Sequence, residues 1–367
     1  MRLIICEKNN AAKRISSILS GNRTSSYKRG KVPIYQFQWK GEETYTIGLR
    51  GHILNLDFPR KYNKWQSVDP RDLIEVTPAK KVSEKNIAPV LKSLCDEAEE
   101  ILIATDYDRE GELIGLEALE FVKGREAVNK AHRARFSSLT PGEIKESFDN
   151  LASLDRDLAD SAEARQVIDL YWGASLTRFI SLASDRLGHD YLSVGRVQSP
   201  TLAIIVDKER EIKKFKPTPY WNIEALFSKE KVEFPADHSA GDIFDEKRAK
   251  QIFEKVQGHK RGEISNVKGR TREDKPPSPF NTTMLIRAAN TLGMQASKIM
   301  SVAERLYNEG YISYPRTDNT VYPDNLDLRE VCETLSKGPY KKASDYILSK
   351  DKIKPTMGKK RTTDHPP

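Results

Sequence analysis

Cysteine and long apolar runs are scarce in this chain. It has 367 residues and only three cysteines, which stand far apart at Cys6, Cys95 and Cys332. Their number and spacing exclude a disulfide scaffold and a zinc pattern. No apolar run is long enough to span a bilayer, and the first residues lack the apolar stretch of a signal peptide. We therefore expect a cytoplasmic protein that has no membrane contact.

A phosphate-binding loop of the Walker type is also missing. The pattern GxxxxGK[ST] does not occur, and the tail Gly358-Lys359-Lys360 does not fit it. We therefore expect no ATP site and no nucleotide cofactor.

Charge, in contrast, is plentiful: 31% of the residues are charged and the net charge is +8. This excess favours a polyanionic partner such as nucleic acid.

The chain opens with a pattern typical of an α/β sheet. An apolar strand over residues 2–6 leads into a polar loop with Glu7 and Lys8, and a helix is predicted over residues 11–19. In such sheets, ligands bind at the carboxyl ends of strands. Glu7 and Lys8 are therefore candidate site residues, although a glutamate is also favoured at any helix N-terminus. A further strand over residues 43–50 precedes His52, a lone histidine that we expect to be structural.

Three acids at alternate positions follow another apolar strand. Residues 101–104 are apolar, Asp106, Asp108 and Glu110 come next, and a helix with apolar residues at helical spacing follows. Carboxylates this close repel one another unless a cation lies between them or they are protonated. Their hard oxygen atoms suit Mg²⁺, which takes substrate phosphate as a further ligand. The three acids are therefore a candidate Mg²⁺ site.

A calcium-binding EF-hand is the competing interpretation of these acids. Gly111 follows them and Glu117 is the twelfth residue of the stretch, as in an EF-hand loop. An EF-hand loop, however, is entered from a helix, whereas residues 100–104 predict a buried strand. The strand favours the magnesium interpretation.

Helical sequence dominates the next part of the chain. A strand is predicted over residues 132–137, and a long helix then extends to about Ala183. The segment 193–201 leads into another helix. With a glycine beside them at this helix start, Arg196 and Gln198 could offer donors to a phosphate.

A β-type alternation begins at Pro217. Strands are expected over residues 220–227, from Glu233 onward and over residues 262–269. A charged, proline-rich linker follows over residues 270–279. This region is expected to be separate and mostly β.

The last part of the chain becomes helical again. Residues 280–307 have a helical pattern with a break near Gly293, and a strand is predicted over residues 311–314. Helix, turn, helix and strand is the outline of a winged-helix DNA-binding module. If this part of the chain is not catalytic, the leading interpretation is that it is a DNA-binding module.

The predicted strand ends at Tyr314, two residues before Arg316. Pro315 stops the strand because proline has no backbone N–H to donate to a neighbouring strand. A phenol has a pKa of about 10, so its phenolate costs roughly 4 kcal/mol at neutral pH. If Tyr314 is a nucleophile, it needs cations beside it, and Arg316 always keeps its charge. The alternative is a half-buried aromatic residue beside a surface arginine.

Five segments, taken in order, resemble the signature segments of the type IA DNA topoisomerases. They are Glu7-Lys8, residues 106–112, residues 193–199, residues 279–283 and residues 311–319. The resemblance spans essentially the whole chain, and the combination of DxDxE with YPRTD is highly specific. The Glu-Lys opening is more similar to the topoisomerase III and archaeal branch than to bacterial topoisomerase I.

The resemblance implies a multidomain fold with α/β, α and β parts. A Rossmann-like Toprim domain would be followed by parts of a toroidal topoisomerase core. We expect the Toprim domain at residues 1–145 and the first part of a helical domain with a DNA groove at 146–205. The first part of a β-rich gate would span 206–272, and a helical, winged-helix-like domain with the nucleophile would span 273–367.

The resemblance also implies roles for individual residues. Tyr314 would attack a DNA phosphate and hold the 5′ end as a phosphotyrosine, while Arg316 steadies the developing charge. Glu7 would exchange a proton with the leaving 3′ oxygen, and Lys8 would contact the scissile phosphate. The Mg²⁺-binding residues would be Asp106, Asp108 and Glu110. The DNA-binding residues would be Arg109, Arg196, Gln198, Ser199, Thr317 and His365.

The acids and Tyr314 lie far apart in the sequence, so an active site that uses both must form at an interface between domains. Opening of this interface would part the broken DNA ends while each stays attached. Because the phosphotyrosine conserves the bond energy, no ATP is needed. We expect a nucleoid-associated monomer that binds single-stranded DNA and relaxes negatively supercoiled DNA.

Two departures from the family pattern stand out. Asn9-Asn10 occupies the place where relatives commonly have Pro-Ser. In the family, the segment that corresponds to residues 363–367 leads on into the rest of the torus, so we expect the chain to be part of a longer protein. Two alternatives stay open: a Toprim nuclease or primase that does not use Tyr314, and a DNA-binding protein without catalysis.

Overall fold

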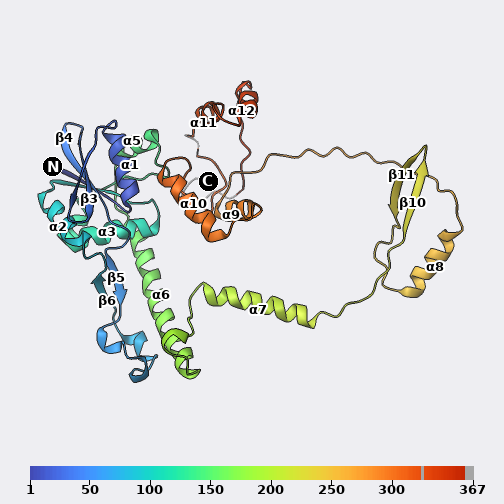
Figure 1. The fold of residues 1–367 in the computed structure, drawn as a ribbon, viewed down its shortest axis with the longest axis horizontal. Helices are drawn as coiled ribbons and strands as arrows, with labels where there is room; N and C mark the ends of the chain where they lie inside the picture. The colour runs from blue at the N-terminus through green and yellow to red at the C-terminus, as the bar shows by residue number, and fades with distance from the viewer. Residues whose placement is uncertain (324–325, 360–367) are drawn as a thin grey trace. The chain divides into compact units, whose positions relative to one another are not determined.

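The computed structural model describes residues 1–323 and 326–359 of the chain. These residues form two compact units, whose elements are labelled in Figure 1. The first unit contains Met1–Arg196 and the described residues from Lys275 onward. The second contains Val197–Asp274.

A seven-stranded mixed sheet forms the centre of the first unit. Its strands are β1 (Arg2–Cys6), β2 (Ser25–Arg29), β3 (Val32–Trp39), β4 (Glu42–Gly48), β7 (Glu100–Ala104), β8 (His132–Arg133) and β9 (Ala152–Ser153). The spatial order is β2-β3-β4-β1-β7-β8-β9. The four strands β4, β1, β7 and β8 pair in parallel, and the outer strands pair antiparallel. A Rossmann-like Toprim fold with this kind of mixed α/β sheet was expected from the resemblance.

The alternation of side chains along β1 explains why both faces of the sheet are covered. Leu3 and Ile5 join one buried cluster, and Ile4 and Cys6 join the other. Helices α2 (Ile87–Glu97) and α3 (Arg109–Lys123) pack on the first face, and α1 (Asn9–Leu19) and α5 (Pro141–Asp149) on the second. A short helix, α4 (Arg125–Val128), follows α3. Strands buried on both faces are typical of parallel α/β sheets.

A small insertion extends from the sheet between β4 and α2. It contains the antiparallel pair β5 (Leu54–Asp57) and β6 (Ala79–Val82) and the short helices η1 (Arg60–Tyr62), η2 (Trp65–Ser67) and η3 (Asp72–Glu75). These elements pack against the long helix α6 (Arg156–Ala183), which the short helix η4 (Gly188–Asp190) follows. Arg178 of α6 lies 5.6 Å from the centre of the Trp65 ring and donates to the carbonyl of Tyr62. The long helix predicted to end at Ala183 is confirmed.

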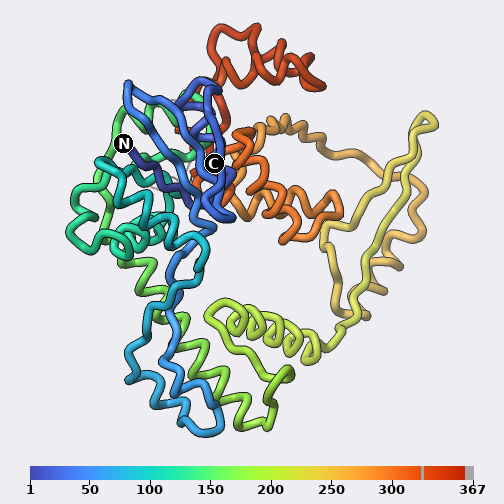
Figure 2. The backbone as a smooth tube through the Cα atoms, turned by 60° about the vertical axis from the view of Figure 1, so that its left-hand side comes forward, coloured from blue at the N-terminus to red at the C-terminus, as the bar shows by residue number. Residues whose placement is uncertain are grey.

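The C-terminal part of the first unit is helical. It contains α9 (Thr282–Asn290), α10 (Ala296–Asn308), α11 (Leu328–Leu335) and α12 (Lys341–Leu348). The predicted helical break near Gly293 is confirmed by the gap between α9 and α10. Helix α10 packs against α1, and in Figure 2 the orange C-terminal helices lie beside the blue N-terminal part of the chain.

Helix α10 ends in a glycine cap rather than in a β-strand. Gly310 has a φ of +80°. Its N–H donates to the carbonyl of Tyr307, and the N–H of Tyr311 donates to the carbonyl of Leu306, both at 2.9 Å. These two bonds form a Schellman motif, which satisfies carbonyl groups at the helix end.

The strand predicted over residues 311–314 is therefore wrong, because the helix cap sets the path of this segment. The predicted alternation of side chains is nevertheless present: Tyr311 is 73% exposed, whereas Tyr314 is 5% exposed. The N–H of Tyr314 donates to the carbonyl of Ser137 at 2.8 Å, but no strand forms here. The helix–turn–helix–strand pattern of a winged helix therefore lacks its predicted strand at residues 311–314.

The strand predicted over residues 132–137 is also shorter than expected. Strand β8 ends at Arg133. Beyond it, the carboxylate of Glu143 accepts hydrogen bonds from the N–H of Ser137 and the hydroxyl of Ser138. These side-chain bonds replace those that a neighbouring strand would make.

The second unit contains α7 (Gln198–Lys214), the antiparallel pair β10 (Glu224–Lys229) and β11 (Val232–Asp237), and α8 (Glu246–Gln257). The strands predicted from residue 220 and from residue 233 correspond to β10 and β11. The turn between them has positive φ at Glu230 and Lys231, which suits a tight hairpin. The strand predicted over residues 262–269 is wrong: this segment is irregular and exposed.

Candidate active site

The loop that carries Glu7 and Lys8 leaves the sheet beside the loop that carries the acids. Cys6 at the end of β1 pairs with Ala104 at the end of β7, so the two loops start as neighbours. Gly48 at the end of β4 makes room for the first loop, because a Cβ atom there would lie only 2.6 Å from the backbone N of Asn9. The topology therefore brings Glu7 close to Asp106.

Lys8 joins the two loops by ion pairs. Its Nζ lies 3.2 Å from Glu7 Oε1 and 3.2 Å from Asp106 Oδ2. Burial works against the charge of Lys8, but Asp106 and Glu7 outweigh burial and raise the pKa of its ammonium group. Lys8 therefore stays charged between the two carboxyl groups.

Asp108 fixes the start of α3. It is the N-cap residue of this helix, and its Oδ1 accepts a hydrogen bond of 2.7 Å from the N–H of Gly111. This is the usual use of aspartate at a helix start. The cap leaves Oδ2 of Asp108 on the side of Tyr314.

Tyr314 meets the acids directly. Its hydroxyl donates to Asp108 Oδ2 at 2.6 Å, across 206 positions of the sequence. The ring lies in the buried cluster that contains Ile4 and Ala104. The structure thus brings together the phenol and the acidic loop, and both belong to the first compact unit.

Three carboxyl groups act on this phenol. Burial, followed by Asp108, Asp106 and Glu7, raises the pKa of Tyr314 well above its ordinary value. Arg316, the cation expected beside it, forms an ion pair of 2.6 Å with Glu304 and its side chain is 63% exposed, although its charge also interacts with Tyr314. In this arrangement the phenol is held in its protonated form.

Glu110 is the acid that the structure does not bring to Tyr314. Its carboxylate lies 3.3 Å from His52 Nε2 and 3.5 Å from Arg165. Among residues 1–323 and 326–359, no group of three or more histidine, cysteine or acidic side chains is arranged to hold a metal ion. In this conformation the three acids do not converge, because Glu110 has partners elsewhere. That they hold Mg²⁺ together stays a prediction.

The donor chemistry nevertheless fits a hard cation. Asp106 and Asp108 offer oxygen atoms beside Tyr314, and Asp106 is only 3% exposed. Oxygen ligands with a surplus of negative charge are those that Mg²⁺ takes. Asp106 and Asp108 could hold such an ion, and Glu110 could join them only after leaving His52 and Arg165.

The EF-hand interpretation is contradicted. The loop is entered from the strand β7 and not from a helix. Glu117, which would be the twelfth ligand, is 2% exposed and accepts from His52 Nδ1 at 2.9 Å and pairs with Lys80 at 3.2 Å. Its oxygen atoms are thus committed to these partners.

His52 has a more specific setting than that of a lone core histidine. It lies between Glu117 and Glu110, and Gln166 Nε2 lies 3.1 Å from its Nε2. Burial lowers the pKa of the imidazole, but the two glutamates outweigh burial and raise it. His52 and Arg165 together therefore hold Glu110 away from Tyr314.

Glu7 has the pKa of a group that can exchange protons near neutral pH. Burial and the neighbouring Asp106 raise its pKa from 4.5 to about 7, although Lys8 works in the opposite direction. A general acid or base works best when its pKa is near the operating pH.

This shift predicts a pH-dependent stability. Between pH 4.5 and about 7 the folded chain binds more protons at Glu7 than the unfolded chain, so wild-type stability falls as the pH rises through this range. In metal-free buffer, we expect Glu7→Gln to be more stable than wild type by about 2 kcal/mol at pH 8 and nearly equal to it at pH 4. Urea unfolding at both pH values measures this, with Glu75→Gln as an exposed control. Equal stabilities at pH 8 would contradict the prediction.

Arg133 is a site residue that sequence reasoning missed. Arg133 and Glu112 are both completely buried and form an ion pair of 2.8 Å. The guanidinium also donates to the carbonyl groups of Thr105 and Asp106 at 2.9 and 2.8 Å. It therefore fixes the backbone of the acidic loop. One signal in the sequence could have indicated it. Glu112 stands beside the apolar Leu113 on a helix expected to pack on the sheet, and a buried carboxylate needs a buried cation as its partner.

Gly111 lets the acidic loop turn tightly into α3. A Cβ atom at this position would overlap the carbonyl oxygen of Asp106 and lie 2.9 Å from its carbon. Since these are backbone atoms, the loop itself would have to move.

We therefore expect Gly111→Ala to destabilise the chain by about 1–3 kcal/mol and to displace Asp106. The midpoint of urea unfolding measures the effect. Gly142→Ala is the matched control, because nothing lies within 4 Å of its added Cβ atom and alanine favours a helix. A destabilisation no larger than that of the control would contradict this account of the loop.

The predicted DNA-binding residues lie in several places. Arg109 is exposed at the start of α3. Arg196 lies 2.5 Å from Asp169 of α6, and Gln198 and Ser199 begin α7 in the second unit. Thr317 is 6% exposed, and its N–H donates to the hydroxyl of Thr282. His365 lies outside the described residues.

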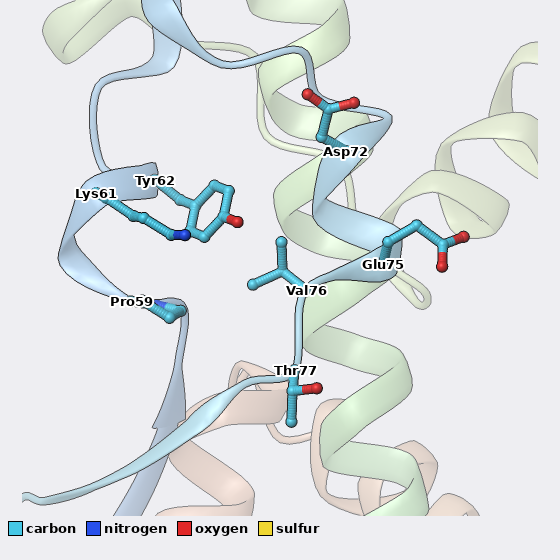
Figure 3. A pocket seen from close by; sticks show the side chains of 7 residues that line it. All are labelled: Pro59, Lys61, Tyr62, Asp72, Glu75, Val76 and Thr77. Carbon is cyan, nitrogen blue, oxygen red and sulfur yellow. The ribbon is translucent and has the colours of Figure 1, made fainter.

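A separate open pocket of about 550 Å³ lies beside the insertion (Figure 3). Val76 points toward Tyr62 there, whereas the carboxylates of Asp72 and Glu75 point away. None of the predicted site residues lines it; the lining residues are Pro59, Lys61, Tyr62, Asp72, Glu75, Val76 and Thr77. The candidate site at Tyr314 and the acids is therefore separate from this pocket.

No helix among the described residues has the length and apolar character needed to cross a lipid bilayer.

Two protein families match the chain. Residues 2–139 match the Toprim domain, and residues 153–367 match the family described as DNA topoisomerase. The first match covers the sheet with Glu7 and the acids. The second covers the part with Tyr314.

Several known topoisomerases are similar to this chain over its whole length. DNA topoisomerase 1 of Thermoplasma acidophilum is 44% identical over 100% of this chain and 47% of its own length. DNA topoisomerase 1 of Archaeoglobus fulgidus is also 44% identical, over 100% of this chain and 53% of its own length. Human DNA topoisomerase 3-beta-1 is 32% identical over 100% of this chain and 45% of its own length. The chain spans about half the length of these curated relatives.

A solved structure has a similar fold. Full-length topoisomerase I from Thermotoga maritima matches with a TM-score of 0.66 and 27% identity, over 91% of this chain and 52% of that one. The match of residues 153–367, together with the archaeal and topoisomerase 3-beta relatives, confirms the resemblance: the chain belongs to the type IA DNA topoisomerase family.

Proposed function

We propose that this chain carries the cleavage site of a type IA DNA topoisomerase. The enzyme would cut one DNA strand, hold its 5′ end on Tyr314, pass a strand through the break and rejoin the ends. It would relax negatively supercoiled DNA without ATP. The observation that carries the proposal is the hydrogen bond of 2.6 Å between Tyr314 and Asp108.

Cleavage requires two proton transfers. The phenol oxygen of Tyr314 forms a bond to phosphorus, and the bond from phosphorus to the 3′ oxygen breaks. Asp108 Oδ2 is the candidate acceptor of the phenol proton because it already accepts that hydrogen bond. Glu7, whose pKa is raised to about 7, is the candidate donor to the 3′ oxygen. Religation reverses both transfers.

Two cations of the chain would stabilise the phosphate. Lys8 lies between Glu7 and Asp106 and would contact the scissile phosphate. Arg316 would steady the charge that develops on the phosphate after it releases Glu304. Positioning and charge stabilisation account for most of the catalysis of phosphoryl transfer.

Magnesium is part of the proposal. Asp106 and Asp108 would hold Mg²⁺, joined by Glu110, and the ion would supply positive charge beside the phosphate. Arg109, Arg196, Gln198, Ser199, Thr317 and His365 are proposed to bind single-stranded DNA. We also retain, as proposals, a monomeric state, the domain limits 1–145, 146–205, 206–272 and 273–367, and a cytoplasmic, nucleoid-associated location.

A labelled oligonucleotide tests the proposal. The 367-residue chain is incubated with single-stranded DNA and Mg²⁺, and the products are separated on a denaturing gel. A 5′-phosphotyrosine keeps the 3′-terminal label on the protein and releases the 5′-terminal label on a shorter fragment. Cleavage without any protein adduct would favour a Toprim nuclease, and binding without cleavage would favour a non-catalytic DNA-binding protein.

A further inference from the structure

A second tyrosine lies inside the candidate active site. Tyr307, in the last turn of α10, is 1% exposed, and its hydroxyl donates to Asp106 Oδ1 at 3.1 Å. The centre of its ring lies 5.2 Å from that of Tyr314, at an interplanar angle of 72°. Tyr307 therefore touches both the proposed nucleophile and one of the proposed Mg²⁺ ligands.

The hydroxyl of Tyr307 is not needed to fill the core. Its ring belongs to a buried cluster with Ile4, Cys6, Ala104 and Tyr314, where phenylalanine would pack equally well. A buried hydroxyl costs free energy unless it makes a hydrogen bond. Among the described residues, the hydrogen-bond partner of this hydroxyl is Asp106, so this contact is what distinguishes a tyrosine from a phenylalanine here.

Tyr307 completes the set of contacts that orient Asp106. Lys8 binds Oδ2 of this carboxylate at 3.2 Å, and Tyr307 binds Oδ1 at 3.1 Å. Arg133 holds the backbone carbonyl of Asp106 at 2.8 Å. With both oxygen atoms and the backbone bound, the carboxylate keeps a single orientation.

The same residue also limits the movement of Tyr314. The edge-to-face contact with Tyr307 lies on the ring of Tyr314, and the hydrogen bond to Asp108 lies at its hydroxyl. Edge-to-face aromatic pairs are a preferred geometry. The side chain of Tyr307 thus connects the ring of Tyr314 to the carboxylate of Asp106.

We propose that Tyr307 is a positioning residue for DNA cleavage, which holds Asp106 in the orientation that the reaction needs. This inference rests on the proposed function. A misplacement of about 1 Å at a reacting centre can lower a rate about 100-fold. We therefore expect Tyr307→Phe to lower the rate of covalent adduct formation by about 10- to 100-fold. Oligonucleotide affinity stays close to wild type and the chain stays folded, since the ring is kept, while the thermal unfolding midpoint falls slightly because Asp106 loses one hydrogen bond.

A matched control is available four residues away. Tyr311 is 73% exposed, so Tyr311→Phe removes a hydroxyl from the same segment without touching Asp106. Adduct formation by this variant is expected to equal that of wild type. If Tyr307→Phe is as fast as Tyr311→Phe, the inference is wrong.

A double-mutant cycle separates positioning from a general loosening of the core. Asp106→Asn, Tyr307→Phe and the double variant are compared for the rate of adduct formation. If Tyr307 acts through Asp106, the double variant is hardly slower than Asp106→Asn alone. Losses that multiply independently would overturn the inference and leave the proposed function intact. A wild-type chain that forms no adduct would instead overturn the proposed function.

Discussion

Replacement of Tyr314 by phenylalanine is expected to abolish the covalent protein–DNA adduct. The variant keeps the buried ring and its contact with Tyr307 but lacks the oxygen atom that would bond to phosphorus. Neither Asp108 nor Glu7 can replace it in a reaction that leaves DNA on a tyrosine. We expect a loss of adduct to below detection, which corresponds to at least about a 1,000-fold lower rate, as for other lost nucleophiles.

Two measurements make this result specific. Oligonucleotide binding by Tyr314→Phe should remain near that of wild type. The thermal unfolding midpoint should fall by only a few degrees, because a single hydrogen bond to a carboxylate contributes about 1.5–3 kcal/mol. The exposed Tyr311→Phe is the matched control and should form the adduct normally. An adduct of wild-type yield in Tyr314→Phe would disprove the assignment of the nucleophile.

Replacement of Arg133 by leucine is expected to cause the largest loss of stability. Arg133 and Glu112 are completely buried, so the variant leaves a carboxylate without its cation in the interior. Removal of one partner of such a pair costs about 3–5 kcal/mol. The carbonyl groups of Thr105 and Asp106 also lose a donor, so we expect the acidic loop to move and the cleavage rate to fall.

Urea unfolding of the unit that contains the sheet measures this loss. Arg125→Leu is the control, because Arg125 is 87% exposed and lies 3.7 Å from Glu120, and exposed pairs contribute about 0–1 kcal/mol. The double variant Arg133→Leu with Glu112→Leu should recover only part of the stability. The N–H of Asp155 donates to Glu112 and would lose its acceptor in the double variant. A loss below about 1 kcal/mol in Arg133→Leu would contradict the importance of this pair.

The sequence predicted the elements of the site better than their contacts. The strand before Asp106 and the helix after Glu110 follow from an apolar run and from helical spacing, which are local signals. The prediction that Tyr314 lies close to the acids followed from the expected reaction, because DNA cleavage would need both in one active site. The family resemblance then gave the fold of the sheet.

The contacts depend on residues that are distant in the sequence. Glu110 points away from Tyr314 because His52 and Arg165 bind it, and no local pattern reveals such partners. The segment before Tyr314 alternates like a strand, yet the glycine cap at Gly310 determines its path. Period-2 alternation indicates only an extended chain, and a ladder also needs a neighbouring strand.

Arg133 was not predicted as a site residue for a different reason. Arginine is almost never fully buried unless it is paired, so an arginine in a predicted strand is first placed at the surface. Its partner Glu112 lies on α3, and the carbonyl groups of Thr105 and Asp106 that it binds lie after β7. Only the three-dimensional arrangement of these elements brings them together.

The most direct test of the account is to identify the residue that carries DNA after cleavage. The adduct formed with Mg²⁺ and a single-stranded oligonucleotide is digested with nuclease and protease, and the modified peptide is sequenced by mass spectrometry. The account predicts a nucleotide joined through its 5′ phosphate to Tyr314. A nucleotide on Tyr307 or on any other residue, or a linkage through the 3′ phosphate, would contradict it.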